Sequence, residues 1–156
     1  MNVKKTYDFS INDVEKMKTY FNKLNENIPN MKIEFISRSL EYIMQHANNY
    51  ISDTTNLKNC WVIDVNANYG TLRNTADYSA YVEFGTGIKG TTDSESGYVT
   101  NLSGKGESGW TYLKDGNFYF THGQKARRYL RKAIEEYIRT GSKSIAESVM
   151  NKYMEV

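Results

Sequence analysis

The sequence predicts an α+β domain, because segments with helical periodicity flank a central region of short segments with strand character. The first third of the chain and the stretch after Gly123 repeat apolar residues every three or four positions, as amphipathic helices do. Between them, short segments rich in aromatic and β-branched residues are typical of strands. We therefore expect a single domain over residues 1–156, with a small antiparallel sheet of about four strands and long helices packed on one face.

Two amphipathic helices are predicted in the first third of the chain. Ser10 and Asp13 have the spacing of a capping box, in which a hydroxyl and a carboxylate each bond an amide at the helix start. Pro29 should end the first helix, because proline has no amide donor and crowds the preceding turn. The apolar face of the first helix comprises Ile11, Val14, Met17, Phe21, Leu24 and Ile28, and that of the second Ile33, Ile36, Leu40, Ile43, Met44, Ala47 and Ile51.

The strands are predicted in the middle of the chain. CWVIDV (residues 60–65) and YSAYVEF (residues 78–84) have the length and the aromatic and β-branched content of strands. TYLKDGNFYF (residues 111–120) places two aromatic-rich arms around Asp115 and Gly116, the preferred pair for a tight hairpin turn. These segments supply the four strands of the expected sheet.

The helical period returns after Gly123 and continues to Gly141, which is expected to end this helix as a C-terminal cap. Its apolar face comprises Ala126, Tyr129, Leu130, Ala133, Ile134, Tyr137 and Ile138. A short last helix is indicated by Ile145, Val149 and Tyr153.

The stretch YVEFGTGIKG (residues 81–90) contains the spacing G-x-G-x-x-G, which is also that of a dinucleotide-binding turn. In such a turn the glycines open a helix, whose N-terminal amides hold the pyrophosphate. Here the glycines are followed by a polar, glycine-rich stretch without helical periodicity, and no Gly-Lys-Ser/Thr or kinase tripeptide occurs in the chain. A sharp exit of the backbone from a strand is the favoured explanation of Gly85 and Gly87.

A long flexible loop between the central strands is predicted over residues 87–109. The stretch from residue 85 to residue 109 holds seven of the eleven glycines and eight serines or threonines, so burial cannot offset its ordering entropy. Connections of this length are usually functional or disordered when they occur in a compact domain. We expect Tyr98, Val99 and Leu102 to contact a neighbouring subunit, while Lys89 and Lys105 are candidate DNA contacts.

Catalysis, metal binding and cofactor binding find little support in the sequence. His46 and His122 lack the spacing of a metal pair, and the lone Cys60 is better explained as a buried strand thiol than as a nucleophile. No segment is long and apolar enough to span a membrane, and the first residues lack an apolar signal segment. The expectation is a protein that is not an enzyme, has no cofactor and folds in the cytosol.

A basic helix over residues 125–139 is the strongest charge cluster. Most of its cations fall opposite the apolar face, and Glu135 and Glu136 lie on the same polar arc, so a solvated, partly paired surface is the favoured interpretation. The alternative is a small nucleic-acid-binding module, for which Arg128 and Arg131 would be candidate DNA contacts. The net charge of +2 is too small to indicate nucleic acid as the main partner.

Three segments, in order, resemble the gp-ten-like tail-component family of tailed bacteriophages. ISDTTNLKNCW (residues 51–61) is similar to the family's P-x-D-T-G-x-L-x-x-S segment, and DYSAYVEFGTG (residues 77–87) to its Y-A-x-Y-V-E-F-G-T signature. FTHGQKARRYLRKAIEEY (residues 120–137) is similar to the closing G-x-x-A-x-x-F-L-x-x-A segment. Together the segments cover roughly residues 30–140.

The resemblance implies a structural protein of the virion, assembled in the cytoplasm of the bacterial host. It would be a tail-completion or head–tail joining component that forms a ring of six copies in the neck, contacts tail-tube and head-closure proteins, and lets the genomic DNA pass. The residues that match the signature and are expected to serve assembly are Tyr81, Glu83, Phe84, Gly85 and Gly87.

Overall fold

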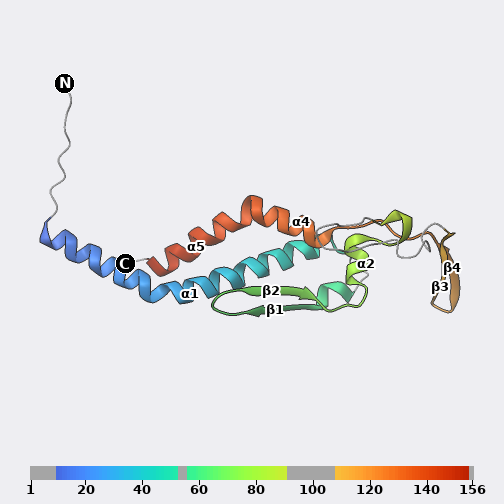
Figure 1. Ribbon diagram of the computed structural model, residues 1–156, viewed down its shortest axis with the longest axis horizontal. Coiled ribbons are helices and arrows are strands. Elements are labelled where there is room, and N and C mark those ends of the chain that lie inside the picture. The colour runs from blue at the N-terminus through green and yellow to red at the C-terminus, as the bar shows by residue number, and fades with distance from the viewer. Residues whose placement is uncertain (1–9, 53–55, 91–107, 155–156) are drawn as a thin grey trace, which may run out of the picture.

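The computed structural model describes residues 10–52, 56–90 and 108–154. They form an elongated molecule with a helical body, a hairpin projecting from one end and the start of the first helix projecting from the other (Figure 1). Long helices occur together with small antiparallel sheets, which confirms the α+β class.

The first helix, α1, runs without interruption from Ile11 to Tyr50. Its start is the predicted capping box: the Asp13 amide donates to the Ser10 hydroxyl, and the Ser10 amide donates to the Asp13 carboxylate. The prediction that Pro29 separates two helices is wrong, because Pro29 lies inside α1. Proline removes one backbone hydrogen bond and bends a helix without necessarily ending it, and α1 changes direction along its length (Figure 1).

After α1, a 3₁₀ turn, η1 (Asn56–Asn59), leads into the hairpin of β1 (Trp61–Val65) and β2 (Gly70–Asn74). The strands pair antiparallel, from Trp61 opposite Asn74 to Val65 opposite Gly70. Strand β1 confirms the prediction, whereas β2 was not predicted. Its first residue touches α1 so closely that a Cβ on Gly70 would lie 2.4 Å from the Ile36 side chain, so this sheet packs directly on the helix.

The segment predicted as a strand over residues 78–84 is instead the short helix α2 (Ser79–Phe84). Six residues are too few for a helix to be stable in isolation, so contacts elsewhere in the fold must hold it. A strand over residues 78–84 would alternate its side chains between two faces, and the helix does not. Glu83 is buried and Tyr81 exposed, although a strand would place both on one face.

The second hairpin is the predicted one and comprises β3 (Trp110–Lys114) and β4 (Asn117–Thr121). Asp115 and Gly116 at its turn both have positive φ, as a type I′ turn requires. In the described residues the strands form two separate two-stranded sheets, so the expectation of one four-stranded sheet is corrected. A segment between the hairpins that folds as helix α2 cannot join them into one sheet.

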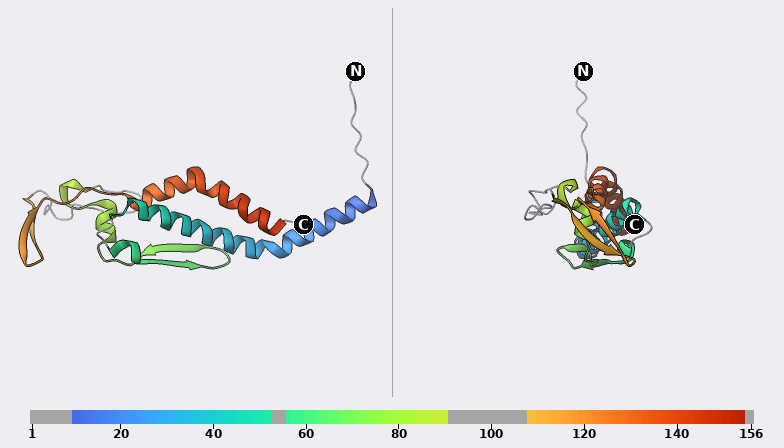
Figure 2. Two further views of the ribbon diagram at one scale, coloured as in Figure 1. Left: turned by 180° about the vertical axis from the view of Figure 1, so that it is seen from behind. Right: turned by 90° about the vertical axis from the view of Figure 1, so that its right-hand side faces the viewer.

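The C-terminal part is helical from α4 (Tyr129–Glu136) through a wide π turn, η4 (Tyr137–Gly141), to α5 (Ser142–Met154). Gly141 does not end a helix as predicted. A Cβ at this position would lie 2.8 Å from the Tyr42 ring of α1, so the glycine serves close contact between two helices. The helices α4 and α5 run along α1 on the side away from β1 and β2 (Figures 1 and 2).

The core lies where α1, η1 and α4 meet. Its buried apolar residues are Ile43, Ala47, Ile51, Leu57, Tyr129 and Ala133. The indole of Trp61 closes one side, because its Nε1 donates to Asn48 Oδ1 at 2.8 Å and its ring meets that of Tyr129 edge-on. This core fixes the end of the body from which the second hairpin projects.

Candidate functional site

The carboxylate of Glu83 holds α2 against the start of α4. One carboxylate oxygen accepts the Leu130 amide at 2.9 Å and the other accepts the Arg131 amide at 3.1 Å. These amides belong to the first turn of α4, whose donors have no partner within the helix. Glu83 thus caps α4 from a distant part of the sequence, and its negative charge lies at the positive end of the helix dipole.

Backbone hydrogen bonds extend this junction. The amides of Arg127 and Arg128 donate to the carbonyl oxygens of Val82 and Glu83, both at 3.0 Å. We call the paired segments 81–87 and 122–131 the junction. The two segments are far apart in the sequence, and here they lie side by side.

Glycines allow the two backbones of the junction to cross closely. Gly85 and Gly87 have φ of 78° and 60°, which confirms that the chain turns sharply here, although it leaves a helix and not a strand. A Cβ on Gly85 would lie 2.4 Å from the Gln124 carbonyl oxygen. Gly123 is still more restricted, because a Cβ there would lie 1.9 Å from the Thr86 carbonyl oxygen. Gly123 was not predicted from the sequence as a site residue.

The remaining signature residues lie at the edges of the junction. Tyr81 is exposed and lines a cavity of about 850 Å³ between the body and the second hairpin, together with Tyr112 and Arg127. Phe84 is half-buried and lines a groove of about 490 Å³ between β2, α2 and α4. Only Tyr81 of the signature therefore presents a largely exposed side chain.

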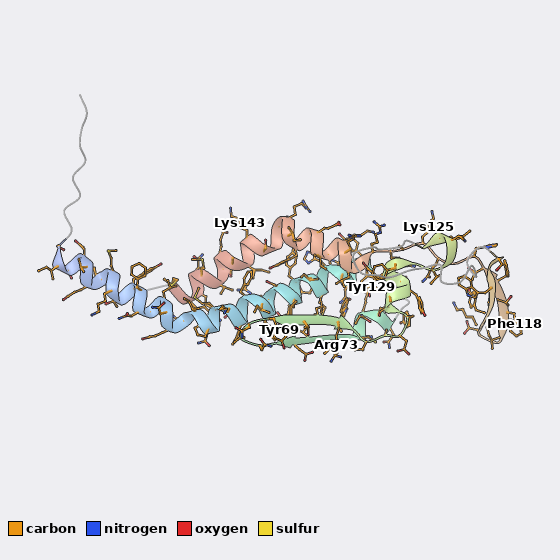
Figure 3. The ribbon with its side chains drawn as sticks, in the orientation of Figure 1. Tyr69, Arg73, Phe118, Lys125, Tyr129 and Lys143 are labelled. Carbon is orange, nitrogen blue, oxygen red and sulfur yellow. The ribbon has the colours of Figure 1, made fainter. Side chains whose placement is uncertain are left out.

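The second hairpin carries the most exposed apolar surface at this end of the molecule. All residues from 111 to 120 are exposed. Leu113 pairs with Phe118 and Thr111 with Phe120, which places these side chains on one face of the ribbon. The large side chains on this face, Leu113, Phe118 and Phe120, are between 62% and 77% exposed and form what we call the hairpin face. Phe118 lies at the outer end of the molecule (Figure 3).

Exposed apolar side chains of this size, gathered on a projecting element, mark a surface for contact with another molecule. A two-stranded hairpin is only marginally stable in water by itself, so it also gains from being covered. The junction supplies a fixed base for the hairpin, because β4 leads through Gly123 to Gln124. The Gln124 carbonyl oxygen accepts the Thr86 amide at 2.9 Å, and the Gln124 amide donates to the Thr86 hydroxyl at 3.1 Å.

The predicted basic helix is only partly helical. Lys125 and Arg127 precede α4, and Arg128, in the left-handed conformation, is its N-cap residue. Arg131 forms an ion pair with Glu135 at 3.8 Å, which confirms the predicted internal pairing. Another cation of α4, Lys132, lies 5.3 Å from the ring centre of Tyr50. The candidate DNA contact Lys89 is exposed on the turn η2 (Gly87–Lys89).

Other predicted site residues fall outside the described part of the chain. The loop residues Tyr98, Val99, Leu102 and Lys105 lie there, so the predicted intersubunit contact and the Lys105 contact stay predictions.

The remaining polar candidates contact different partners. His46 stacks on Tyr42 and bonds its carbonyl oxygen, and His122 meets the Phe120 ring edge-on. Cys60 is half-buried and lies just before β1, so its prediction as a buried strand thiol is wrong. Among residues 10–52, 56–90 and 108–154, no group of three or more His, Cys, Asp or Glu side chains could hold a metal ion. Within the same residues no helix has both the length and the apolar character to cross a membrane.

Tyr129 gives the junction a pH-dependent contribution to stability. Burial, and secondly the negative charge of Glu83, raise the pKa of Tyr129 to about 12. Since the phenol has a pKa of about 10 in an unfolded chain, its contribution is complete below about pH 10 and is lost as the pH rises toward 12. The Tyr129→Phe variant should lose less stability over this range than the wild type in denaturant titrations. Parallel pH profiles would contradict the assignment.

Comparison of the chain with family models, curated proteins and solved structures finds no match.

Proposed function

We propose that this chain is a structural component of the virion of a tailed bacteriophage, assembled in the host cytoplasm. It acts at the neck as a tail-completion or head–tail joining protein and forms a ring, with six copies as the expected number. Its role is adhesion between proteins and not catalysis. The observation that carries the proposal is the exposed hairpin face, held away from the body on the junction.

The junction links this observation to the resemblance. The Y-V-E-F-G-T segment and the closing segment each contain residues that join the two, namely Glu83 on one side and the Leu130 and Arg131 amides on the other. The residues that hold the junction together, and so position the second hairpin, thus lie within the two segments on which the resemblance rests. In a ring, the hairpin face of one copy packs against a neighbouring copy, and the ring contacts tail-tube and head-closure proteins around the passing DNA.

Self-association is expected to depend on the hairpin face. The double substitution Phe118→Thr and Phe120→Thr removes two exposed rings and replaces them by β-branched residues that suit a strand. It should weaken association at least about tenfold, or about 1.4 kcal/mol. The matched control is Tyr69→Thr, which removes a ring of similar exposure from the turn between β1 and β2. Sedimentation over a wide concentration range measures both; equal behaviour of the two variants would contradict the assignment.

The virion assignment has its own test. Mass spectrometry of purified particles should find the chain, and a phage lacking it should accumulate heads and tails that do not join. Normal infectious particles without the chain would exclude a neck function, whatever the oligomeric state of the purified protein.

The alternative function, a nucleic-acid-binding module, is favoured by one observation. Lys125, Arg127 and Arg128 are all exposed within four residues at the start of α4. Binding to a phosphate backbone would weaken steeply with salt, and replacing these three residues by glutamine would reduce that dependence. If duplex DNA does not shift at physiological ionic strength, this alternative is excluded.

A further inference from the structure

The side of α1 that faces α5 has a strict heptad pattern. Seven apolar residues alternate in steps of three and four between residues 14 and 35, which is the spacing of a helix that packs along another helix. The pattern continues across Pro29 without a change of phase. We call these residues the α1 seam: Val14, Met17, Phe21, Leu24, Ile28, Met31 and Phe35.

Helix α5 covers only the C-terminal part of the α1 seam. Met31 and Phe35 lie beside Ala146, Val149 and Met150 of α5 around an apolar groove of about 290 Å³. The contact ends near Asn27, whose side-chain amide donates to the Tyr153 carbonyl oxygen at 3.3 Å. Beyond this point α1 projects past the end of α5 (Figures 1 and 2).

The N-terminal part of the α1 seam is uncovered by the described residues. Val14, Met17 and Phe21 are between 48% and 56% exposed, although they occupy the same face that α5 covers farther along. An unbroken heptad pattern on an uncovered helix indicates a second helix as its partner, because each seam residue inserts between four residues of a facing helix.

The charges beside the α1 seam favour a second copy in parallel orientation. In a parallel pair of helices, the residue just before the first seam residue of a heptad faces the residue five positions later in the partner helix. This register places Asp13 opposite Lys18 of the other copy, a pair of opposite charge. The hydroxyl and amide of Ser10 hydrogen-bond the Asp13 carboxylate and lower its pKa, so the charge persists at neutral pH. An antiparallel pair of the exposed parts would instead bring like positions together, such as Lys18 of each copy, which are both basic.

We propose that the exposed N-terminal part of the α1 seam pairs in parallel with the same part of a second copy. This inference rests on the proposed ring and names one of its subunit contacts. Rotation about a ring axis preserves the direction of every helix along that axis, so parallel pairing is compatible with closure. About two heptads are too short for a stable isolated coiled coil, and contacts elsewhere in the ring must hold the helices together.

Disulfide trapping tests the pairing and its direction in the full chain. In a Cys60→Ser parent, Val14→Cys and Phe21→Cys are made separately, one heptad apart on the α1 seam. Parallel in-register helices bring each cysteine to its own counterpart, so both variants should form disulfide-linked dimers on mild oxidation. Thr19→Cys is the matched control, because residue 19 lies on the opposite side of α1 and should cross-link at least tenfold less.

A charge substitution provides a second readout. Lys18→Glu places like charges opposite each other and should reduce trapping at residue 21, whereas Lys16→Glu makes the same charge change away from the α1 seam and should not.

Sedimentation of the same samples separates this inference from the ring itself. If the protein forms oligomers but Val14→Cys and Phe21→Cys each cross-link no better than Thr19→Cys, the pairing is overturned and the ring stands. Cross-linking at only one seam position would indicate antiparallel helices and would also overturn the proposal. A monomer at every concentration would overturn both the pairing and the ring.

Discussion

Replacing Glu83 by alanine is expected to destabilise the protein by about 3 kcal/mol. The carboxylate is buried and accepts the Leu130 and Arg131 amides, so its removal leaves two donors of α4 without a partner and opens a cavity beside α2. Chemical denaturation measures the loss. Glu83→Gln keeps one acceptor of the same shape and should cost less than the alanine substitution.

Glu135→Ala is the matched control for Glu83→Ala. Its side chain is 69% exposed and its ion pair with Arg131 spans 3.8 Å, so the loss should stay below about 0.5 kcal/mol. Both glutamates contact Arg131, Glu83 through the backbone amide and Glu135 through the side chain, but only Glu83 caps the helix. Similar losses for both variants would show that the cap formed by Glu83 adds no more stability than a surface ion pair.

Glu83 also shows why the centre of the fold was mispredicted. The segment YSAYVEF has the composition of a strand, and short apolar runs do not distinguish a strand from a helix by periodicity. What decides for the helix is a hydrogen bond between residues 47 positions apart, which no local pattern records. From the sequence, Glu83 was named only as a candidate assembly residue, and its role as a helix cap was not predicted.

Local signals predicted the other elements better. Asp115 and Gly116 specify their turn without help from the rest of the chain, and the predicted hairpin is present with both residues at positive φ. Pro29 failed as a stop signal because the apolar spacing on either side of it stays in phase. That phase was visible in the sequence and is a better guide to helix continuity than the proline alone.

The junction glycines give the second prediction with a large effect. Gly85→Ala should destabilise the protein by about 3 kcal/mol and release the second hairpin from its fixed position. Gly85 has φ of 78° and ψ of −170°, a region that essentially only glycine occupies. The added Cβ would also lie 2.4 Å from the Gln124 carbonyl oxygen and 2.7 Å from the Ala126 amide, so the two backbones of the junction must separate. Thermal and chemical denaturation measure the loss.

Gly116→Ala is the control for Gly85→Ala. It introduces the backbone strain of positive φ without the crowding between the two segments of the junction. Gly116 has the same φ of 78°, but a Cβ there meets nothing within 4 Å, so the substitution should cost only about 1 kcal/mol. Because the Gly116 variant keeps the junction intact, it should self-associate like the wild type, whereas the Gly85 variant should fail to assemble even where it remains folded. Equal losses of stability, with assembly retained in both, would mean that the junction does not position the hairpin for assembly.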